Sequence, residues 1–217
     1  MSTRIWSWVR ITGLFVALAL PASAQAAFIT LNEAELDAIF SQGSLSIDIR
    51  FNPAVILPDA SFLDVGTEAE VLAFLALAMT LNSSPTVNML FVDTISWCGI
   101  TDTSFIGCGE LPGNNFMVES VSADMANGGV LLAHELGHNL GLEHIIDTAN
   151  LMHPFIGPGT TLSLLQQDDI LLSPLIQTDE FGDFISITPI VVTPEPATAT
   201  LLAFALVGLA WNRRRSA

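Results

Sequence analysis

Lysine and tyrosine are absent from the 217-residue sequence, and its six arginines stand against 22 acidic residues. The formal net charge at pH 7 is −16 and the pI is about 4.2. Five of the arginines lie in the two end segments, which leaves Arg50 as the one Lys or Arg between them. A surface of this sign repels phosphate backbones, so the composition argues against nucleic acid as a partner. It is compatible with calcium, which takes oxygen ligands, although a simply solvated acidic surface explains most of the carboxylates.

Cysteine is scarce as well. The two cysteines are Cys98 and Cys108, and the segment between them contains glycine. In an exported protein, two cysteines this close in sequence predict a disulfide that closes a short loop, with a contribution of ~2–3 kcal/mol to stability.

Two apolar segments mark the ends of the chain. Residues 1–26 have a positive start, an apolar core at 11–20 and small residues near their end, which predicts a secretory signal peptide. Residues 194–217 combine Pro-Glu-Pro, an apolar run as far as Trp211 and a cluster of arginines. In physical terms this is a short transmembrane helix held by cytoplasmic arginines. The length of the remaining segment, 27–193, suits one domain.

The segment between the ends carries alternating helix and strand signals. Apolar and polar residues alternate over 45–51, which predicts a half-buried strand. Thr67 and Ser163 are each followed three residues later by Glu or Gln, and these capping signals predict helices over 71–79 and 164–172. We further expect a helix over 31–40 capped by Asn32, strands over 87–92 and 116–118, and an added edge strand at 185–188.

Three of the four histidines fall in the stretch His134 to His144, which reads HELGHNLGLEH. On a helix, His134 and His138 point to one face, where both imidazoles can bind one ion. Catalytic zinc takes three protein ligands and keeps one position open, and Gly141 can end the helix with positive φ so that His144 turns back to the metal. Glu135 is placed to take a proton from a zinc-bound water rather than to bind the ion. A bare HExxH occurs by chance in many helices, but the five fixed positions here indicate a zinc site.

The pattern HExxHxxGxxH is that of the metzincin zinc peptidases, which this sequence resembles at every defining position. Asn150–Pro154 resembles their methionine turn, with Met152 as its methionine, and Gln167–Ile170 is similar to the start of the last helix of matrixin catalytic domains. One departure is His153, where matrixins commonly have tyrosine. The resemblance implies an α+β, metzincin-like (zincin) catalytic domain over 27–193, with a twisted, mostly parallel sheet backed by helices, the zinc helix, and a small C-terminal subdomain. It also implies one catalytic Zn2+ and the activity of a zinc endopeptidase.

The same resemblance implies where a peptide substrate binds. In the metzincin arrangement an extended substrate pairs with the free edge of the sheet, for which the region 105–118 is the candidate. In matrixins the residues after the turn methionine wall the pocket for the substrate side chain that follows the scissile bond. The matching residues are His153, Pro154, Phe155 and Ile156. Three of these four are apolar and the surface is acidic, so we expect cleavage before large apolar residues in neutral or basic peptides.

The C-terminal segment 194–217 is similar to the PEP-CTERM sorting signal of Gram-negative bacteria. This resemblance implies an exosortase-type sorting enzyme as a partner, transient anchoring in the inner membrane, and a final location at the cell surface or outside the cell. Whether the C-terminal helix is removed or stays as a permanent anchor is open at this point. Such signals occur equally on adhesive and matrix proteins. The alternative function is therefore a catalytically weak metzincin-fold surface or extracellular-matrix binding protein. Glu135 argues against this alternative, because a site that only binds does not need the base.

Overall fold

The computed structural model describes residues 27–102 and 104–194. The predicted signal peptide at 1–26 and nearly all of the predicted sorting signal lie outside these residues. Among the residues that are described, no helix has the length and apolar character needed to span a membrane.

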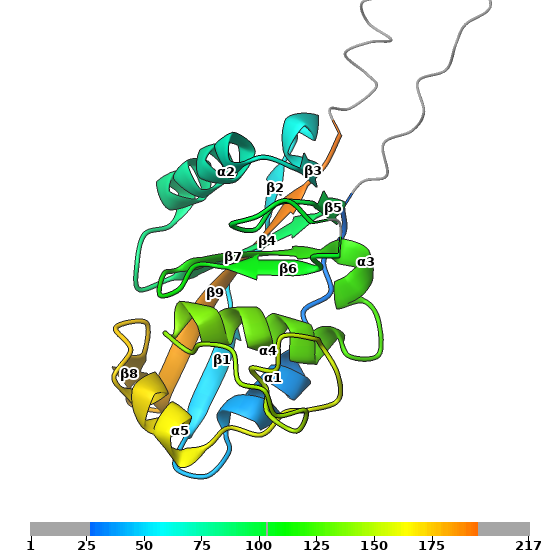
Figure 1. Cartoon of the computed structure of the whole chain (residues 1–217). Helices are drawn as coiled ribbons and strands as arrows, with labels where there is room; N and C mark the ends of the chain where they lie inside the picture. Colours follow the sequence, from blue (N-terminus) through cyan, green and yellow to red (C-terminus); the bar gives the residue numbers. More distant parts are fainter. Residues whose placement is uncertain (1–26, 103, 195–217) are drawn as a thin grey trace, which may run out of the picture.

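A mostly parallel sheet forms the centre of the domain (Figure 1). Its seven strands are β1 (Ile47–Phe51), β2 (Val55–Leu57), β4 (Val87–Val92), β6 (Gly107–Gly109), β7 (Asn115–Glu119), β8 (Gln177–Asp179) and β9 (Gly182–Val192). The main path runs β1-β9-β4-β7-β6, and both β2 and β8 also pair with β9. All pairings are parallel except those of β6 with β7 and of β8 with β9. A separate parallel pair consists of β3 (Asp64–Val65) and β5 (Thr94–Ile95).

Helices cover both faces of this sheet (Figure 1). One face carries α1 (Glu33–Phe40), α4 (Gly128–Asn139) and α5 (Leu164–Leu171), and the other carries α2 (Glu68–Leu81). A short α3 (Ser120–Ala123) precedes α4, and a 3-10 helix, η1 (Ala60–Phe62), precedes β3. The buried residues of α2, Val71, Phe74 and Ala78, recur at helical spacing and join the main hydrophobic core. The predicted fold class, a mostly parallel sheet backed by helices, is therefore confirmed.

Most of the predicted elements form where the local signals place them. The strand over 87–92 matches β4, and the helices over 71–79 and 164–172 lie within or close to α2 and α5. Thr67 and Ser163 both accept a hydrogen bond at the start of their helix, as their capping signals predict. Asn32 occupies the N-cap position of α1, as predicted, but its side chain makes no cap hydrogen bond and donates to the carbonyl of Ala123 instead.

Residues 185–188 form a strand as predicted, but the predicted position of this strand at the edge of the sheet is wrong. These residues belong to β9, which lies in the middle of the sheet between β1 and β4. Ser186 and Thr188 alternate with isoleucines and so predict a solvent-facing side, yet Thr188 is buried. Nδ2 of Asn52 donates to Ser186 Oγ at 2.9 Å and to Thr188 Oγ1 at 3.0 Å, and this pairing satisfies both hydroxyl groups within the sheet. After Gly141 the chain thus builds the smaller lower part with α5 and then returns to the centre of the sheet (Figure 1).

Candidate metal centre

Helix α4 carries the first two predicted ligands and is buried along its whole length. It packs between α1 and the strands β6 and β7. A Cβ added at Gly129 would lie 2.5 Å from the carboxyl carbon of Glu35 on α1, so glycine is needed where the two helices meet. At the other end, Gly141 has φ +94°, and its amide donates to the carbonyl of His138 at 2.9 Å. The predicted positive φ at Gly141 is confirmed, and it redirects the chain toward His144.

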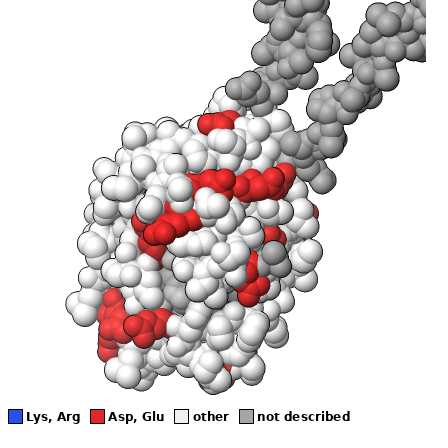
Figure 2. Space-filling view, turned by 45° about the horizontal axis from the view of Figure 1, so that its top comes forward, with Lys and Arg blue, Asp and Glu red and all other residues white. Residues whose placement is uncertain are grey.

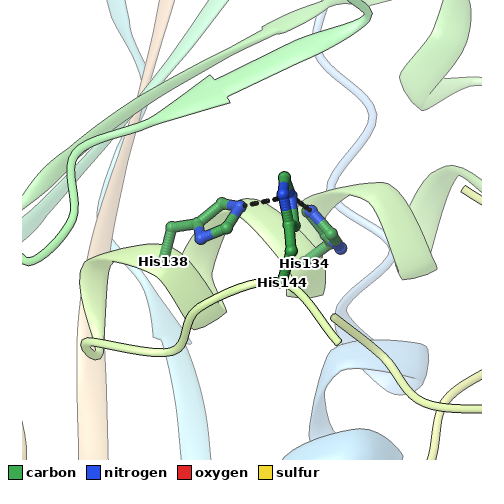
Figure 3. A group of neighbouring side chains, drawn as sticks. All are labelled: His134, His138 and His144. Carbon is green, nitrogen blue, oxygen red and sulfur yellow. Dashed lines mark hydrogen bonds between the residues drawn. The ribbon is translucent and has the colours of Figure 1, made fainter. Parts of the chain in front are cut away.

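The imidazoles of His134, His138 and His144 meet beside α4 (Figure 3). Nε2 of His144 lies 3.2 Å from Nε2 of His134 and 3.2 Å from Nε2 of His138. One ligand atom from each ring lies within 4.8 Å of the others. In the part of the chain that the structure describes, this is the one group of three or more His, Cys, Asp or Glu that could share an ion.

The second nitrogen of two rings is held by the backbone. Nδ1 of His134 lies 2.8 Å from the carbonyl oxygen of Leu151, and Nδ1 of His138 lies 2.8 Å from the carbonyl oxygen of Leu142. A carbonyl only accepts hydrogen bonds, so each Nδ1 carries the proton and each Nε2 presents its lone pair to the shared point. Metal-binding histidines are commonly oriented by this kind of contact.

Burial keeps these rings in the form that binds metal. It lowers the pKa of His134 to about 4, and it also lowers the pKa of His138 and of the more exposed His144. A neutral imidazole is the ligand form. Three such rings with converging lone pairs fit Zn2+, which in catalytic sites takes three protein ligands and leaves a fourth position open. The calcium expectation gains no support, because no comparable group of carboxylates occurs among the described residues.

Glu135 is buried between α4 and the edge strand β6, with 5% of its surface exposed. Burial raises the pKa of its carboxyl to about 8, and a hydrogen bond from the backbone of Gly109 opposes this shift. A cation held by the neighbouring histidines would also favour the ionised carboxylate. A Cβ added at Gly107 would lie 2.7 Å from the Glu135 carboxyl carbon, so the absence of a side chain there makes room for the carboxylate.

Met152 lies fully buried beneath α4. Its sulfur would be 2.5 Å from a Cβ added at Gly137, so glycine allows the helix to pass directly over the turn. Asn150 stabilises the turn, because its Oδ1 accepts a hydrogen bond from the Met152 amide at 2.9 Å. The side chains of Asn150 and Gln166 of α5 exchange two hydrogen bonds, of 2.8 and 3.1 Å. Because the carbonyl of Leu151 in the same turn orients a ligand imidazole, this amide pair also supports the metal centre.

A cavity of about 400 Å³ opens beside the histidines. Of the residues predicted to wall the substrate pocket, Pro154, Phe155 and Ile156 line this cavity. His153 is not among its lining residues, and its Nδ1 instead lies 3.0 Å from the carbonyl oxygen of Phe155. The facing wall comes from residues 104–109, which overlap the predicted substrate edge at 105–118, and β6 is the last strand on that side of the sheet.

Sequence reasoning did not single out Gly107 and Gly109, which bring β6 into contact with Glu135. Their Gly-x-Gly spacing was the available signal, since glycine within a strand often marks a close approach of backbone. The residue between them, Cys108, forms the predicted disulfide with Cys98, with an S–S distance of 2.04 Å and a Cα–Cα distance of 5.8 Å. Both cysteines line the cavity, so the cross-link lies at the site itself.

The surface around the domain is acidic. On the face drawn in Figure 2, acidic side chains gather in several groups and no Lys or Arg is visible. Arg50, the one Lys or Arg among the described residues, forms ion pairs with Asp48 at 2.6 Å and Asp179 at 2.5 Å. The one cationic guanidinium is thus already neutralised, and the field of the domain is negative.

Comparison with known proteins places this site in a family. The family model described as Matrixin matches residues 30–173, a range that includes α4, the methionine turn and α5. Searches of curated proteins and of solved structures gave no significant match. The family match covers more than half of the sequence, and the three histidines that it contains converge on one point. The chain belongs to the matrixin family of zinc metallopeptidases.

Proposed function

We propose that this matrixin is an exported zinc-dependent endopeptidase that hydrolyses peptide bonds with Glu135 as general base. The observation that carries the proposal is the meeting of three histidine Nε2 atoms and the Glu135 carboxyl in one cavity beside the edge strand β6. A site for binding alone would need the histidines but not the buried carboxyl next to them.

In this proposal His134, His138 and His144 hold the zinc. Bound zinc polarises the scissile carbonyl and lowers the pKa of the attacking water. Glu135 takes the proton of that water as the new C–O bond forms, and delivers it to the leaving amine as the C–N bond breaks. Burial raises the pKa of this carboxyl to about 8, and a zinc ion on the neighbouring histidines would favour its ionised form, which is the form that accepts the proton.

The substrate is an extended peptide that pairs with the open edge of β6. Glu119, at the end of β7, donates its amide to the carbonyl of Ile106 at 2.9 Å. In an antiparallel ladder, successive residues direct their backbone groups alternately toward and away from the partner strand. The backbone groups of Gly107 and the carbonyl of Gly109 therefore point away from β7, where a substrate strand can bond to them. This places the peptide along the cavity that contains the histidines.

The apolar wall of the cavity sets the side-chain preference. Pro154, Phe155 and Ile156 follow the turn methionine, and their apolar side chains offer no hydrogen-bond partner to a polar or charged substrate side chain. A Leu, Ile, Phe or Met side chain gains about 1.5–3 kcal/mol from full burial there. The negative field disfavours acidic substrates. We therefore assign neutral or basic peptides with a large apolar residue after the scissile bond as the preferred substrates.

The enzyme acts outside the cytoplasm in this proposal. Residues 1–26 direct export, and residues 194–217 are recognised by an exosortase-type enzyme that anchors the protein briefly in the inner membrane before it reaches the cell surface or the medium. The disulfide supports this route, because such bonds persist in oxidising compartments.

A peptide-library digestion with the purified, zinc-loaded protein tests the proposal. Glu135→Ala should retain zinc and fold but lose about 10²–10⁴-fold in turnover. Glu143→Ala is the matched control, since Glu143 is also adjacent in sequence to a ligand histidine, His144, yet is exposed, and the variant should cleave at the wild-type rate. Zinc-loaded wild-type protein that cleaves no peptide would favour the surface-binding alternative, and a fully active Glu135→Ala variant would remove Glu135 from the base role.

A further inference from the structure

The Gly-Cys-Gly segment that forms β6 contacts other elements on both faces of the sheet. Side chains alternate along a strand, so Gly107 and Gly109 face one side and Cys108 faces the other. A Cβ added at Gly107 would lie 2.7 Å from the Glu135 carboxyl carbon, and one added at Gly109 would lie 2.8 Å from the Glu135 carbonyl oxygen. The backbone of β6 therefore lies directly against α4 and its Glu135 side chain, with no side chain from Gly107 or Gly109 in between.

On the opposite face, Cys108 is bonded to Cys98. The loop that carries Cys98 has hydrogen bonds of its own, from the Cys98 amide to the Ile100 carbonyl at 3.0 Å and from the Asp102 amide to the Ser96 carbonyl at 3.1 Å. This loop follows β5, which pairs with β3 rather than with the main sheet. The disulfide thus connects β6 to a second structural unit, in addition to its ladder with β7.

That ladder is short. Strand β6 pairs with β7 over three residues and is the last strand on its side of the sheet. Its backbone at Gly107 and Gly109 forms the proposed substrate edge, and the same Gly109 also hydrogen-bonds the Glu135 carboxylate. Short edge elements with few hydrogen bonds open locally at low free-energy cost. Any such opening would displace the substrate edge and the contact with Glu135 together.

We propose that the Cys98–Cys108 disulfide is a positioning element of the peptidase reaction, which holds Gly107–Gly109 against α4 in the geometry that turnover requires. This inference rests on the proposed peptidase function. Neither cysteine belongs to the group of three histidines that can share an ion, so loss of the cross-link affects turnover far more than zinc binding. It forms by thiol–disulfide exchange, in which the two thiols lose two electrons and two protons to a partner disulfide that becomes a dithiol. The enzyme therefore reaches full activity only after an oxidising partner has acted on it.

The test compares the full-length, zinc-loaded protein with its Cys98→Ser/Cys108→Ser double variant. We expect stoichiometric zinc at unchanged affinity and a kcat that falls about ten- to hundredfold, the scale of a small misplacement of reacting groups. We also expect faster hydrogen exchange at the amides of 107–109. A purely structural disulfide would lower the unfolding temperature without a selective loss of kcat in the folded, zinc-bound protein.

A second variant disturbs the same contact between β6 and α4 while the disulfide stays intact. Gly109→Ala inserts a Cβ between β6 and α4 and should reproduce the loss of kcat with zinc still bound. Gly157→Ala is the control, because its Cβ would meet its nearest neighbour at 4.0 Å, and it should leave kcat unchanged. If the double variant does not fold, Gly109→Ala and reversible reduction of folded wild-type protein provide the comparison.

Wild-type kcat in the folded double variant, or in reduced wild-type protein, would overturn the proposal. If zinc-loaded wild-type protein cleaves no peptide at all, the proposed function fails for a separate reason. The exchange measurement still tests the positioning role in that case: unchanged exchange at 107–109 after loss of the disulfide would overturn it, whereas faster exchange would support it.

Discussion

The paired side-chain amides of Asn150 and Gln166 link α5 to the methionine turn, and their contribution can be measured. Besides the two hydrogen bonds between them, Oε1 of Gln166 accepts from the Ser163 amide at 2.9 Å. Both side chains are buried. Gln166→Ala therefore removes three hydrogen bonds and leaves the Asn150 amide group without this partner. With about 1–3 kcal/mol for a buried unsatisfied group and about 1 kcal/mol for the lost cap, we expect the free energy of unfolding to fall by about 2–4 kcal/mol.

A double-mutant cycle with Asn150→Ala isolates the pair itself. Two hydrogen bonds, each worth about 0.5–1.5 kcal/mol net, predict a coupling energy of about 1–3 kcal/mol. The assay is urea unfolding at a fixed free zinc concentration, since bound metal raises apparent stability. Gln167→Ala is the matched control: this buried neighbour bonds Ser44 and Leu162, away from the turn, so it should be destabilising without coupling to Asn150. Additive effects of Asn150→Ala and Gln166→Ala, within about 0.3 kcal/mol, would refute the reasoning.

The same variants separate general stability from support of the metal. The carbonyl of Leu151, next to Asn150, orients His134, so a loosened turn should weaken zinc binding. Loss of an outer contact to a ligand typically costs 10–100-fold in metal affinity, and for this more distant pair we expect about tenfold in Gln166→Ala. Gln167→Ala should keep the wild-type affinity. Chelator competition measures both, and an equal loss in the two variants would show that α5 acts through stability alone.

Three further changes test other contacts of the site. His144→Ala should lower zinc affinity severely, since His134 and His138 on one helix leave the ion under-coordinated; stoichiometric zinc at unchanged affinity in a chelator titration would contradict the three-histidine assignment. Gly137→Ala places a Cβ 2.5 Å from the Met152 sulfur and should cost about 1–3 kcal/mol in urea unfolding, whereas an unchanged midpoint would mean that the sulfur moves aside freely. Peptide-library cleavage should favour a large apolar residue after the scissile bond and disfavour acidic peptides, and a preference for charged or very small residues there would show that the predicted wall does not form the pocket.

The metal centre could be predicted from the sequence because its geometry is local. His134 and His138 share a helix face at a spacing of four residues, and Gly141 takes the positive φ that the turn to His144 requires. The disulfide is also local, with ten residues of sequence separation between Cys98 and Cys108. In each case the contacts join residues that are close in sequence, so spacing and residue type carry the information.

The contacts that were missed join segments far apart in the chain. Thr188 is buried because Asn52, 136 positions away, satisfies its hydroxyl group, and no pattern within 185–188 reveals that partner. Gly107 meets Glu135 across the cavity wall, 28 positions along the sequence (135 − 107). His153 matches the position of a wall residue, but its ring bonds the backbone of Phe155 and does not line the cavity. Local alternation cannot distinguish such arrangements, because they depend on which elements the fold brings together.

The position of β9 determines how much of the chain the metal centre depends on. The family match ends at residue 173, whereas β9, at Gly182–Val192, lies beyond it and separates β1 from β4 as a parallel neighbour of both. A chain that stopped at the end of the match would leave the facing backbone groups of β1 and β4 without partners in the interior of the sheet, where unpaired groups are costly. Since α4 packs on strands of this sheet, the histidines and Glu135 lose their support if its centre is missing. The unit that must fold to build the site therefore extends at least to Val192, next to the start of the predicted sorting signal.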